Sequence, residues 1–451
     1  MMRKIAIVSL LAAGSAFAAS IAIGGDSRVD PSRFRITEFA TGLNSPYGMQ
    51  MLGDGSLLVG VSQGFFGTPG NLVRFTDTNH DGVADGPGTV VFSNLPRIMT
   101  SVRRAGDLVL TMSDNGGQPV ISVLRPDANP SATYTSLGSI QFTMTAGWWH
   151  TAYTMAVRDT PGLPGSYDVF FNVGSQHNIA PTTGAVTTSG LVSGALQGDS
   201  IFKFSVSNTA GTPSFSGYTQ IAHGLRNAAG IVVQPGTGDL IFTDNGIDGL
   251  VNVNEPLSAD ELNRIASAEI GGAVEEFGFP DDYVTYRTGA IMGGTHIQPL
   301  VAFQPLGDPQ TGSESEGPAE IAFAPTGFPG GLNNGIFVGF HGRGSLAGVA
   351  NEENPVVYYD LTTGEYFHFI DNNQPVGHID SLLATSDSLF LADYSSTGSG
   401  TPGTGVIYQI QALPVLAPEP GARGLALLGL AALGWRWLCG KHLRKQVDVL
   451  L

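Results

Sequence analysis

The sequence predicts an all-β protein whose strands form a six-bladed β-propeller. Its 451 residues include 62 glycines and 27 prolines, and only 13% are charged. This composition is too apolar for a disordered chain and too rich in glycine for a helical one. Apolar and polar residues alternate at period two between glycine-marked turns, and such packets of three or four strands recur six times. Radial repetition of small sheets is typical of a propeller, and a pair of β-sandwiches is the alternative.

Each packet begins at a glycine or proline that is followed by an alternating run. The six packets start near Pro46, Pro96, Gly147, Gly224, Gly317 and Gly377. Because their spacing is uneven, the connecting segments must carry the extra residues. We expect the propeller over residues 35–412, with the long insertions 176–200 and 248–316 on one face.

The N-terminus has the pattern of a cleaved secretory signal peptide, expected over residues 1–19. Arg3 and Lys4 precede an apolar run from Ile5 to Ala13, and the small-x-small sequence Ala16-Phe17-Ala18 follows. A signal peptidase recognises such a site. The apolar run is too short to remain as a membrane span.

The C-terminus has three parts in a fixed order. Pro418-Glu419-Pro420 is followed by an apolar segment, 425–438, and then by the basic residues Lys441, Arg444 and Lys445. The segment 417–446 resembles a PEP-CTERM sorting signal with a short hydrophobic helix. The resemblance implies an exosortase-type partner, transient passage through the inner membrane, and a secreted or cell-envelope location in a Gram-negative-type bacterium. A plain membrane anchor is the alternative.

Net charge and cysteine content restrict the partners and the means of stabilisation. A formal charge of −17 disfavours binding to nucleic acid or anionic lipid. The one cysteine, Cys439, lies in the tail, so the propeller has no disulfide. An exported domain without disulfides needs another source of stabilisation, and we expect a bound metal ion.

The stretch DTNHDGVAD predicts a calcium loop. Oxygen ligands at alternate positions surround one hard cation, and Gly82 permits the sharp turn between them. The expected ligands are Asp77, Asn79, Asp81, Asp85 and the carbonyl of Val83. The loop lacks the glutamate that completes an EF-hand, and a solvated acidic turn is the alternative.

Several further stretches, in the order GWWHTAYTMAVRD, HGLRNAAGIVV, TDNGID and FVGFHGR, carry a family resemblance. Together they resemble the soluble glucose/sorbosone dehydrogenases, six-bladed propellers that use pyrroloquinoline quinone (PQQ) and calcium. The resemblance extends from about Gly42 to Gln411.

The resemblance implies roles for individual residues. His150 matches the base that takes the substrate hydroxyl proton, and a neutral imidazole suits that step. Arg226 matches the arginine that stabilises charge on the quinone oxygen. The implied cofactor contacts are Trp149, Arg226, Asn227, Asn245 and Arg343, and the carbonyls of Gly246 and Ile247 are implied calcium ligands. The alternatives are a packed histidine and a structural ion pair.

The resemblance thus implies an exported oxidoreductase acting on a sugar-like alcohol or aldehyde. The alternative function is a non-catalytic, calcium-stabilised envelope propeller that binds glycan or extracellular matrix. The expected ligand is a sugar or an exopolysaccharide. His177 and His341 are expected to be satisfied loop histidines, and entry into the central cleft is the alternative.

Overall fold

The protein is described here by a computed structural model. It describes residues 21–62, 69–127, 133–208, 211–250, 255–306, 310, 317–342, 356–370, 378–394 and 402–414. The expected signal peptide, the sorting segment and Arg343 therefore lie outside the described residues. The chain divides into two units, Met1–Ala412 and Leu413–Leu451. Within the described residues no helix has the length and apolarity needed to cross a membrane.

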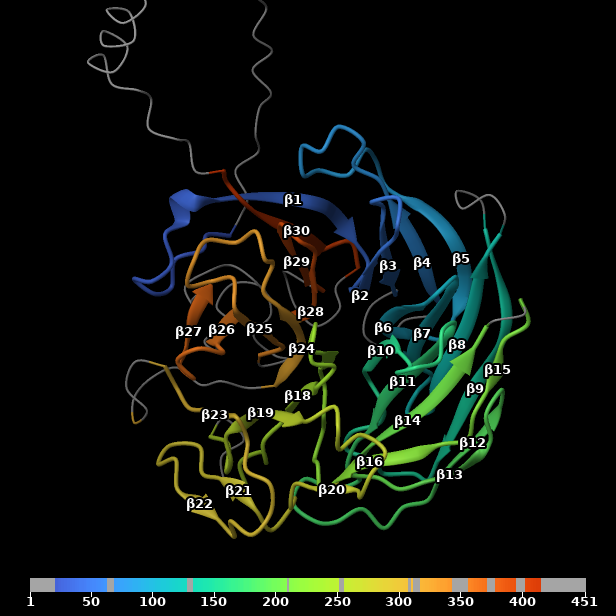
Figure 1. The fold of residues 1–451 in the computed structure, drawn as a ribbon, viewed down its shortest axis with the longest axis vertical. Coiled ribbons are helices and arrows are strands. Elements are labelled where there is room, and N and C mark those ends of the chain that lie inside the picture. Colours follow the sequence, from blue (N-terminus) through green and yellow to red (C-terminus); the bar gives the residue numbers. More distant parts are fainter. Residues whose placement is uncertain are drawn as a thin grey trace, which may run out of the picture. The chain divides into compact units, whose positions relative to one another are not determined.

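Among the described residues, six sheets of four or more strands form the blades of the first unit, one for each predicted packet (Figure 1). Blade 1 comprises β2 (Pro46–Met51), β3 (Leu57–Val61), β4 (Gly70–Phe75) and β5 (Thr89–Leu95). Blade 2 comprises β6 (Ile98–Ala105), β7 (Leu108–Asp114), β8 (Pro119–Pro126) and β9 (Tyr134–Met144). Blade 3 comprises β10 (Met155–Asp159), β11 (Ser166–Val173), β14 (Ser200–Ser207) and β16 (Thr219–His223).

The remaining blades follow in chain order. Blade 4 comprises β17 (Ile231–Val233), β18 (Leu240–Asp244), β19 (Asp260–Ile265) and β23 (Val301–Phe303). Blade 5 comprises β24 (Pro318–Phe323), β25 (Gly335–Phe340), β26 (Val356–Asp360) and β27 (Tyr366–Ile370). Blade 6 comprises β28 (Ile379–Ala384), β29 (Ser388–Asp393), β30 (Gly405–Ala412) and β1 (Phe34–Leu43).

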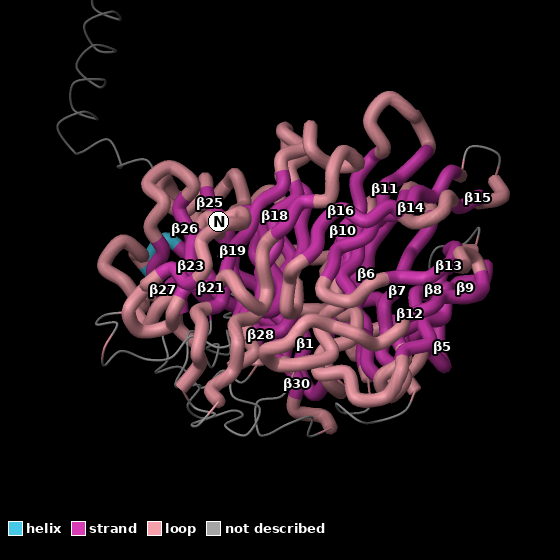
Figure 2. The backbone as a smooth tube through the Cα atoms, turned by 90° about the horizontal axis from the view of Figure 1, so that it is seen from below, coloured by secondary structure: helices cyan, strands magenta, loops and turns pink. Residues whose placement is uncertain are grey.

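The first strand of each blade lies at the centre of a closed ring. Each of β2, β6, β10, β17 and β24 contacts the first strand of the next blade, and β28 contacts both β24 and β2. This order confirms the six-bladed propeller and excludes a pair of sandwiches. For the described residues, Figure 2, coloured by secondary structure, shows strands and loops apart from the 3-10 turn η1 (Pro31–Arg33).

The N-terminal strand closes the ring. β1 pairs antiparallel with β30 and so becomes the outer strand of blade 6. Ahead of it, Ile21, Ile23 and Val29 are buried in the core shared by blades 5 and 6. The packed unit therefore joins residues from both ends of the propeller segment.

The long insertions build additional strands as well as loops. β12 (Val186–Gly190) and β13 (Gly194–Leu196) extend blade 2, although they follow β11 of blade 3 in the chain. β15 (Ser214–Phe215) and β20 (Glu275–Glu276) join blade 3, and β21 (Tyr283–Val284) pairs with β22 (Ile291–Met292). The insertions thus widen the sheets around the ring.

Candidate functional site

A cavity of about 300 Å³ lies at one end of the ring axis. Tyr47 of β2, Thr100 of β6, Pro318 of β24 and Asp380 of β28 line it near the beginnings of their strands. The inner strands run in the same direction, so their N-terminal ends and the loops before them meet there. The volume falls at the lower end of the range for small-molecule pockets. We call it the axial pocket.

The structure brings His150 and Arg226 into this pocket from two different loops. The His150 N–H donates to the Ser175 carbonyl at 2.9 Å, and the Ser175 N–H donates to the Arg226 carbonyl at 2.8 Å. Gly174 is needed for this approach, because a Cβ there would lie 2.7 Å from the His150 Cβ. The backbone of residues 174–175 therefore holds both predicted catalytic residues side by side.

The Arg226 guanidinium is buried, with 3% of its side chain exposed, and it is already paired. Its Nη2 donates to Asp248 Oδ2 at 2.7 Å and to Asn178 Oδ1 at 2.9 Å. Sequence reasoning did not single out Asp248 or Asn178, because both lie in insertions without periodic pattern. Arg226 thus lies in the pocket, as predicted, and it also forms the ion pair that was the alternative interpretation of this residue.

The predicted asparagines are held by one another and by buried carboxylates. Asn227 Nδ2 donates to Asn245 Oδ1 at 2.5 Å, and Asn245 Nδ2 donates to the Pro318 carbonyl at 2.9 Å. The Asp244 carboxylate accepts the backbone N–H groups of Arg226 at 3.0 Å and of Asn227 at 2.6 Å. These contacts fix the pocket wall between blades 4 and 5.

His150 is a neutral imidazole with a free nitrogen. Its Nε2 is buried and has no hydrogen-bond partner among the residues that the structure describes. Burial, together with the positive charge of Arg226, holds the pKa of His150 well below its usual value. A buried polar atom without a partner is costly unless a ligand satisfies it. His150 therefore has the protonation state and the vacant nitrogen of a general base.

A second histidine, His341, is a loop residue that lies in the wall of the same pocket. Its Nδ1 lies 2.7 Å from Asp380 Oδ1. Burial alone would lower the pKa of His341, but the charge and hydrogen bond of Asp380 raise it overall. Its ring stacks on His378 at 4.3 Å, and His378 stacks on Tyr394 at 4.8 Å.

The two adjacent tryptophans have different environments. Trp148 packs against the core shared by blades 2 and 3. Trp149 is 57% exposed, and its Nε1 donates to Asp248 Oδ2 at 3.1 Å. They lie in a loop, so tertiary contacts, and not strand alternation, direct them apart. Asp248 thus links the exposed indole to the Arg226 guanidinium.

The predicted calcium ligands have other partners in this structure. The Ile247 carbonyl accepts the N–H groups of Leu257 at 2.8 Å and of Ser258 at 3.3 Å. In the other loop, Asp77 accepts the backbone N–H groups of Asp81 and Gly82.

Within the described part of the chain, no three His, Cys, Asp or Glu side chains are grouped to hold a metal. The remaining loop donors also accept local N–H groups, namely Asn79 from Asp81, Asp81 from Val83, and Asp85 from Thr78. Calcium binding stays a prediction.

No family model matches this sequence. No curated protein matches it either. Solved structures do resemble the fold. The PQQ domain of pyranose dehydrogenase from Coprinopsis cinerea, in its holo form, is 16% identical with a TM-score of 0.52, over 88% of this chain and 98% of that one.

Two further structures resemble the fold to the same degree. A calcium structure of a Trichoderma reesei enzyme of carbohydrate-active family AA12 is 15% identical with a TM-score of 0.53, over 88% of this chain and 99% of that one. The PQQ-bound aldose sugar dehydrogenase from Streptomyces coelicolor is 15% identical with a TM-score of 0.51, over 85% and 100%. At these identities the likeness establishes a shared fold: this chain is a six-bladed propeller built like those of PQQ-type sugar dehydrogenases.

Proposed function

We propose that the axial pocket binds a sugar-like alcohol or aldehyde. The observation that carries this proposal is the composition of the described pocket wall, in which many side-chain hydrogen-bond acceptors and donors stand among apolar surface. Its hydrogen-bonding groups are Tyr47, Thr100, His150, Tyr153, Arg226, Asn227, Asn245, Asp248, Asp260, His341 and Asp380. Carboxylates and amides recognise hydroxyl groups, and a site built to hydrogen-bond a hydroxyl rejects analogues that lack it. The exposed indole of Trp149 beside Asp248 offers an apolar face for a sugar ring.

Ligand-observed NMR and calorimetry with aldoses and alditols test this proposal. The Tyr47→Phe variant removes one hydroxyl from the wall and is expected to weaken binding about tenfold, equivalent to about 1.4 kcal/mol. Gln50→Ala, on the same strand but in a separate cavity, is the matched control. A chain that binds none of these polyols would contradict the proposal.

An oxidoreductase acting on the same ligand is the second candidate. It is favoured by the unpartnered His150 Nε2 beside Arg226, an arrangement of a base and a positive group within one pocket. The described wall does not fit PQQ itself. That cofactor carries three carboxylates, whereas the wall presents three carboxylates of its own, Asp248, Asp260 and Asp380, and one guanidinium already paired with Asp248. Like charges gathered in a partly buried site repel strongly.

Reconstitution separates the two candidates. Calcium and PQQ are added to the purified chain, and quinone absorbance and dye reduction are followed with an aldose panel. Dye reduction that disappears in His150→Ala would support the oxidoreductase. Aldose binding without quinone-dependent reduction would discard the oxidoreductase and leave the binding function intact.

Export and sorting are proposed on the sequence pattern alone. Cleavage after the signal peptide and processing near Pro418 would give the mature chain a secreted or envelope location. Mass spectrometry of the protein from its native envelope would identify both ends. A retained C-terminal segment would favour the plain anchor.

A further inference from the structure

The axial pocket contains two histidines from different blades. The charged residue beside one histidine is positive, and the charged residue beside the other is negative. His150 precedes β10 of blade 3 and has a positively charged neighbour, Arg226. His341 follows β25 of blade 5 and has a negatively charged partner, Asp380. Both line one cavity of about 300 Å³. A ligand of monosaccharide size would therefore contact both walls.

The Asp380 contact determines which His341 nitrogen is available to a ligand. Because Nδ1 lies 2.7 Å from Asp380 Oδ1, Nδ1 carries a proton and Nε2 is left for the cavity. The His341 side chain is 29% exposed, whereas that of Asp380 is 3% exposed. The buried carboxylate thus supports the more exposed ring, which reaches the cavity.

The groups facing His341 come from three elements and the opposite wall. They are Asp380 on β28, His378 before it, Tyr394 after β29, Tyr47 on β2 beside Asp380, and, across the pocket, Arg226, Asp248 and Asp260. Burial, together with the charge of His341, lowers the pKa of His378 to about 4, so His378 is a neutral packing partner. Asp380 is the charged group in direct contact with His341, which favours the imidazolium form.

We propose that His341, supported by Asp380, is the general acid of the axial pocket and acts with His150 as base to open the ring of a bound aldose. This inference rests on the proposed sugar-binding function and adds an activity to it. It requires neither metal nor hydride acceptor, which suits a wall whose charges do not match PQQ. Two groups of one type, whose pKa values are moved in opposite directions by their surroundings, are the arrangement expected for an acid–base pair.

The reaction balances without a co-reactant. His150 Nε2 takes the proton from the anomeric hydroxyl, and the bond between the anomeric carbon and the ring oxygen breaks as the carbonyl forms. The ring oxygen receives the proton from His341 Nε2. Closure on either face of the carbonyl reverses both transfers, so the net result is exchange between the two anomers.

Exchange NMR on the α and β anomers of a bound aldose, with the full chain at several pH values, tests the proposal. Wild type should accelerate exchange over buffer alone. The rate should fall at high pH as His341 deprotonates, and at low pH as His150 becomes protonated. His341→Gln should lower the rate by at least about 100-fold and abolish the alkaline fall, while affinity stays within threefold. Asp380→Asn should move the alkaline fall to lower pH.

His296→Gln is the matched control, because His296 Nδ1 lies 2.8 Å from Asp282 Oδ2 in a similar pair outside the axial pocket. It should leave both rate and pH profile unchanged. Aldose binding without accelerated exchange would overturn the inference and keep the proposed function, whereas no binding would remove both. An unchanged profile in a folded His341→Gln or Asp380→Asn variant would also overturn it.

Discussion

Asp244 shows how a single buried side chain sets the position of the site. Its two carboxylate oxygens accept the backbone N–H groups of Arg226 and Asn227, which fixes the loop that presents both side chains. Burial raises the pKa of Asp244 to about 7, although the hydrogen bonds from those N–H groups oppose the rise. The residue therefore titrates near neutral pH in the folded protein.

This pKa predicts how stability depends on pH. The pKa of Asp244 in the folded protein lies above its unfolded value of about 4, so the folded state binds the proton more tightly. The resulting stabilisation is fully present below pH 4 and is lost as pH rises through 7. Asp244→Asn cannot titrate and should flatten this loss, which chemical denaturation at pH 5 and 8 measures. The exposed Asp387→Asn serves as control and should leave the slope unchanged.

Calcium binding is tested at the residue scale as well. If the DTNHDGVAD loop holds calcium, a chelator should lower the melting temperature, because a site saturated a hundredfold above Kd adds about 2.7 kcal/mol. Asp81→Ala should remove most of that sensitivity, whereas exposed Asp281→Ala should not. Equal melting with and without chelator would identify the loop as a solvated acidic turn.

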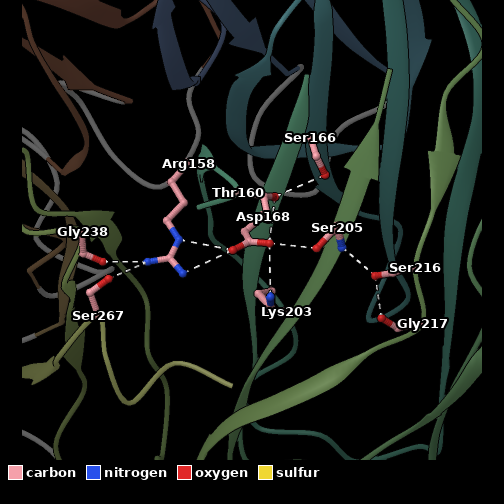
Figure 3. A network of polar contacts seen from close by, with 10 residues as sticks. All are labelled: Arg158, Thr160, Ser166, Asp168, Lys203, Ser205, Ser216, Gly217, Gly238 and Ser267. Carbon is pink, nitrogen blue, oxygen red and sulfur yellow. Dashed lines mark hydrogen bonds and ion pairs between the residues drawn. The ribbon is translucent and has the colours of Figure 1, made fainter. Parts of the chain in front are cut away.

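Among the elements, β10 and β11 are joined by a polar network around Asp168 (Figure 3). The buried Asp168 carboxylate accepts from Ser205 at 2.8 Å and Thr160 at 3.1 Å, and it pairs with Lys203 and Arg158. Arg158 also donates to the Gly238 carbonyl at 2.9 Å and to Ser267 Oγ at 3.2 Å. The network therefore connects blade 3 to blade 4.

Removal of this carboxylate should destabilise the protein. Asp168→Ala leaves two cations partly buried without their partner, which costs about 3–5 kcal/mol in such cases. Burial alone would raise the pKa of Asp168, but the Ser205 hydrogen bond and the Lys203 charge lower it overall. The stabilisation is thus present at neutral pH and lost in acid. Denaturation of Asp168→Ala against the exposed Asp159→Ala measures it, and a difference below 1 kcal/mol would contradict the prediction.

The whole molecule depends on β1 to close the ring. Phe39 of β1 is buried and packs edge-on against Phe390 of β29 at 5.4 Å and Phe75 of β4 at 6.4 Å. The predicted calcium loop also contacts this strand, since Thr37 Oγ1 donates to the Gly82 carbonyl at 2.5 Å. One N-terminal strand therefore joins the first and last blades.

Phe39→Ala should weaken the packing by which β1 joins the first and last blades. Loss of a buried phenylalanine costs about 3–5 kcal/mol, so the midpoint of denaturation should fall clearly. Leu163→Ala removes a side chain that is mostly exposed and should change stability little. Equal midpoints for the two variants would show that β1 does not hold the ring.

Most of the fold could be predicted from the sequence, because its signals are local. Period-two alternation and glycine turns located four of the six inner strands within two residues, as at Pro46 for β2 and Gly377 for β28. The inner strands β10 and β17 begin eight and seven residues after the predicted starts Gly147 and Gly224. The order of motifs also placed His150, Arg226, Asn227 and Asn245 at one site. The insertions were predicted less well, since β12 pairs with a blade that it does not follow in the chain.

The sequence by itself determined the strand pattern, the blade count and four residues of the axial pocket, namely His150, Arg226, Asn227 and Asn245. Only the tertiary structure decided that Asp248 pairs with Arg226 and that Asp380 supports His341. These pairs are 22 and 39 residues apart, and Asp248 lies in an insertion while Asp380 lies on β28. These contacts form only when the ring closes and brings the six strand ends together. Local backbone preferences do not determine which residues then come into contact.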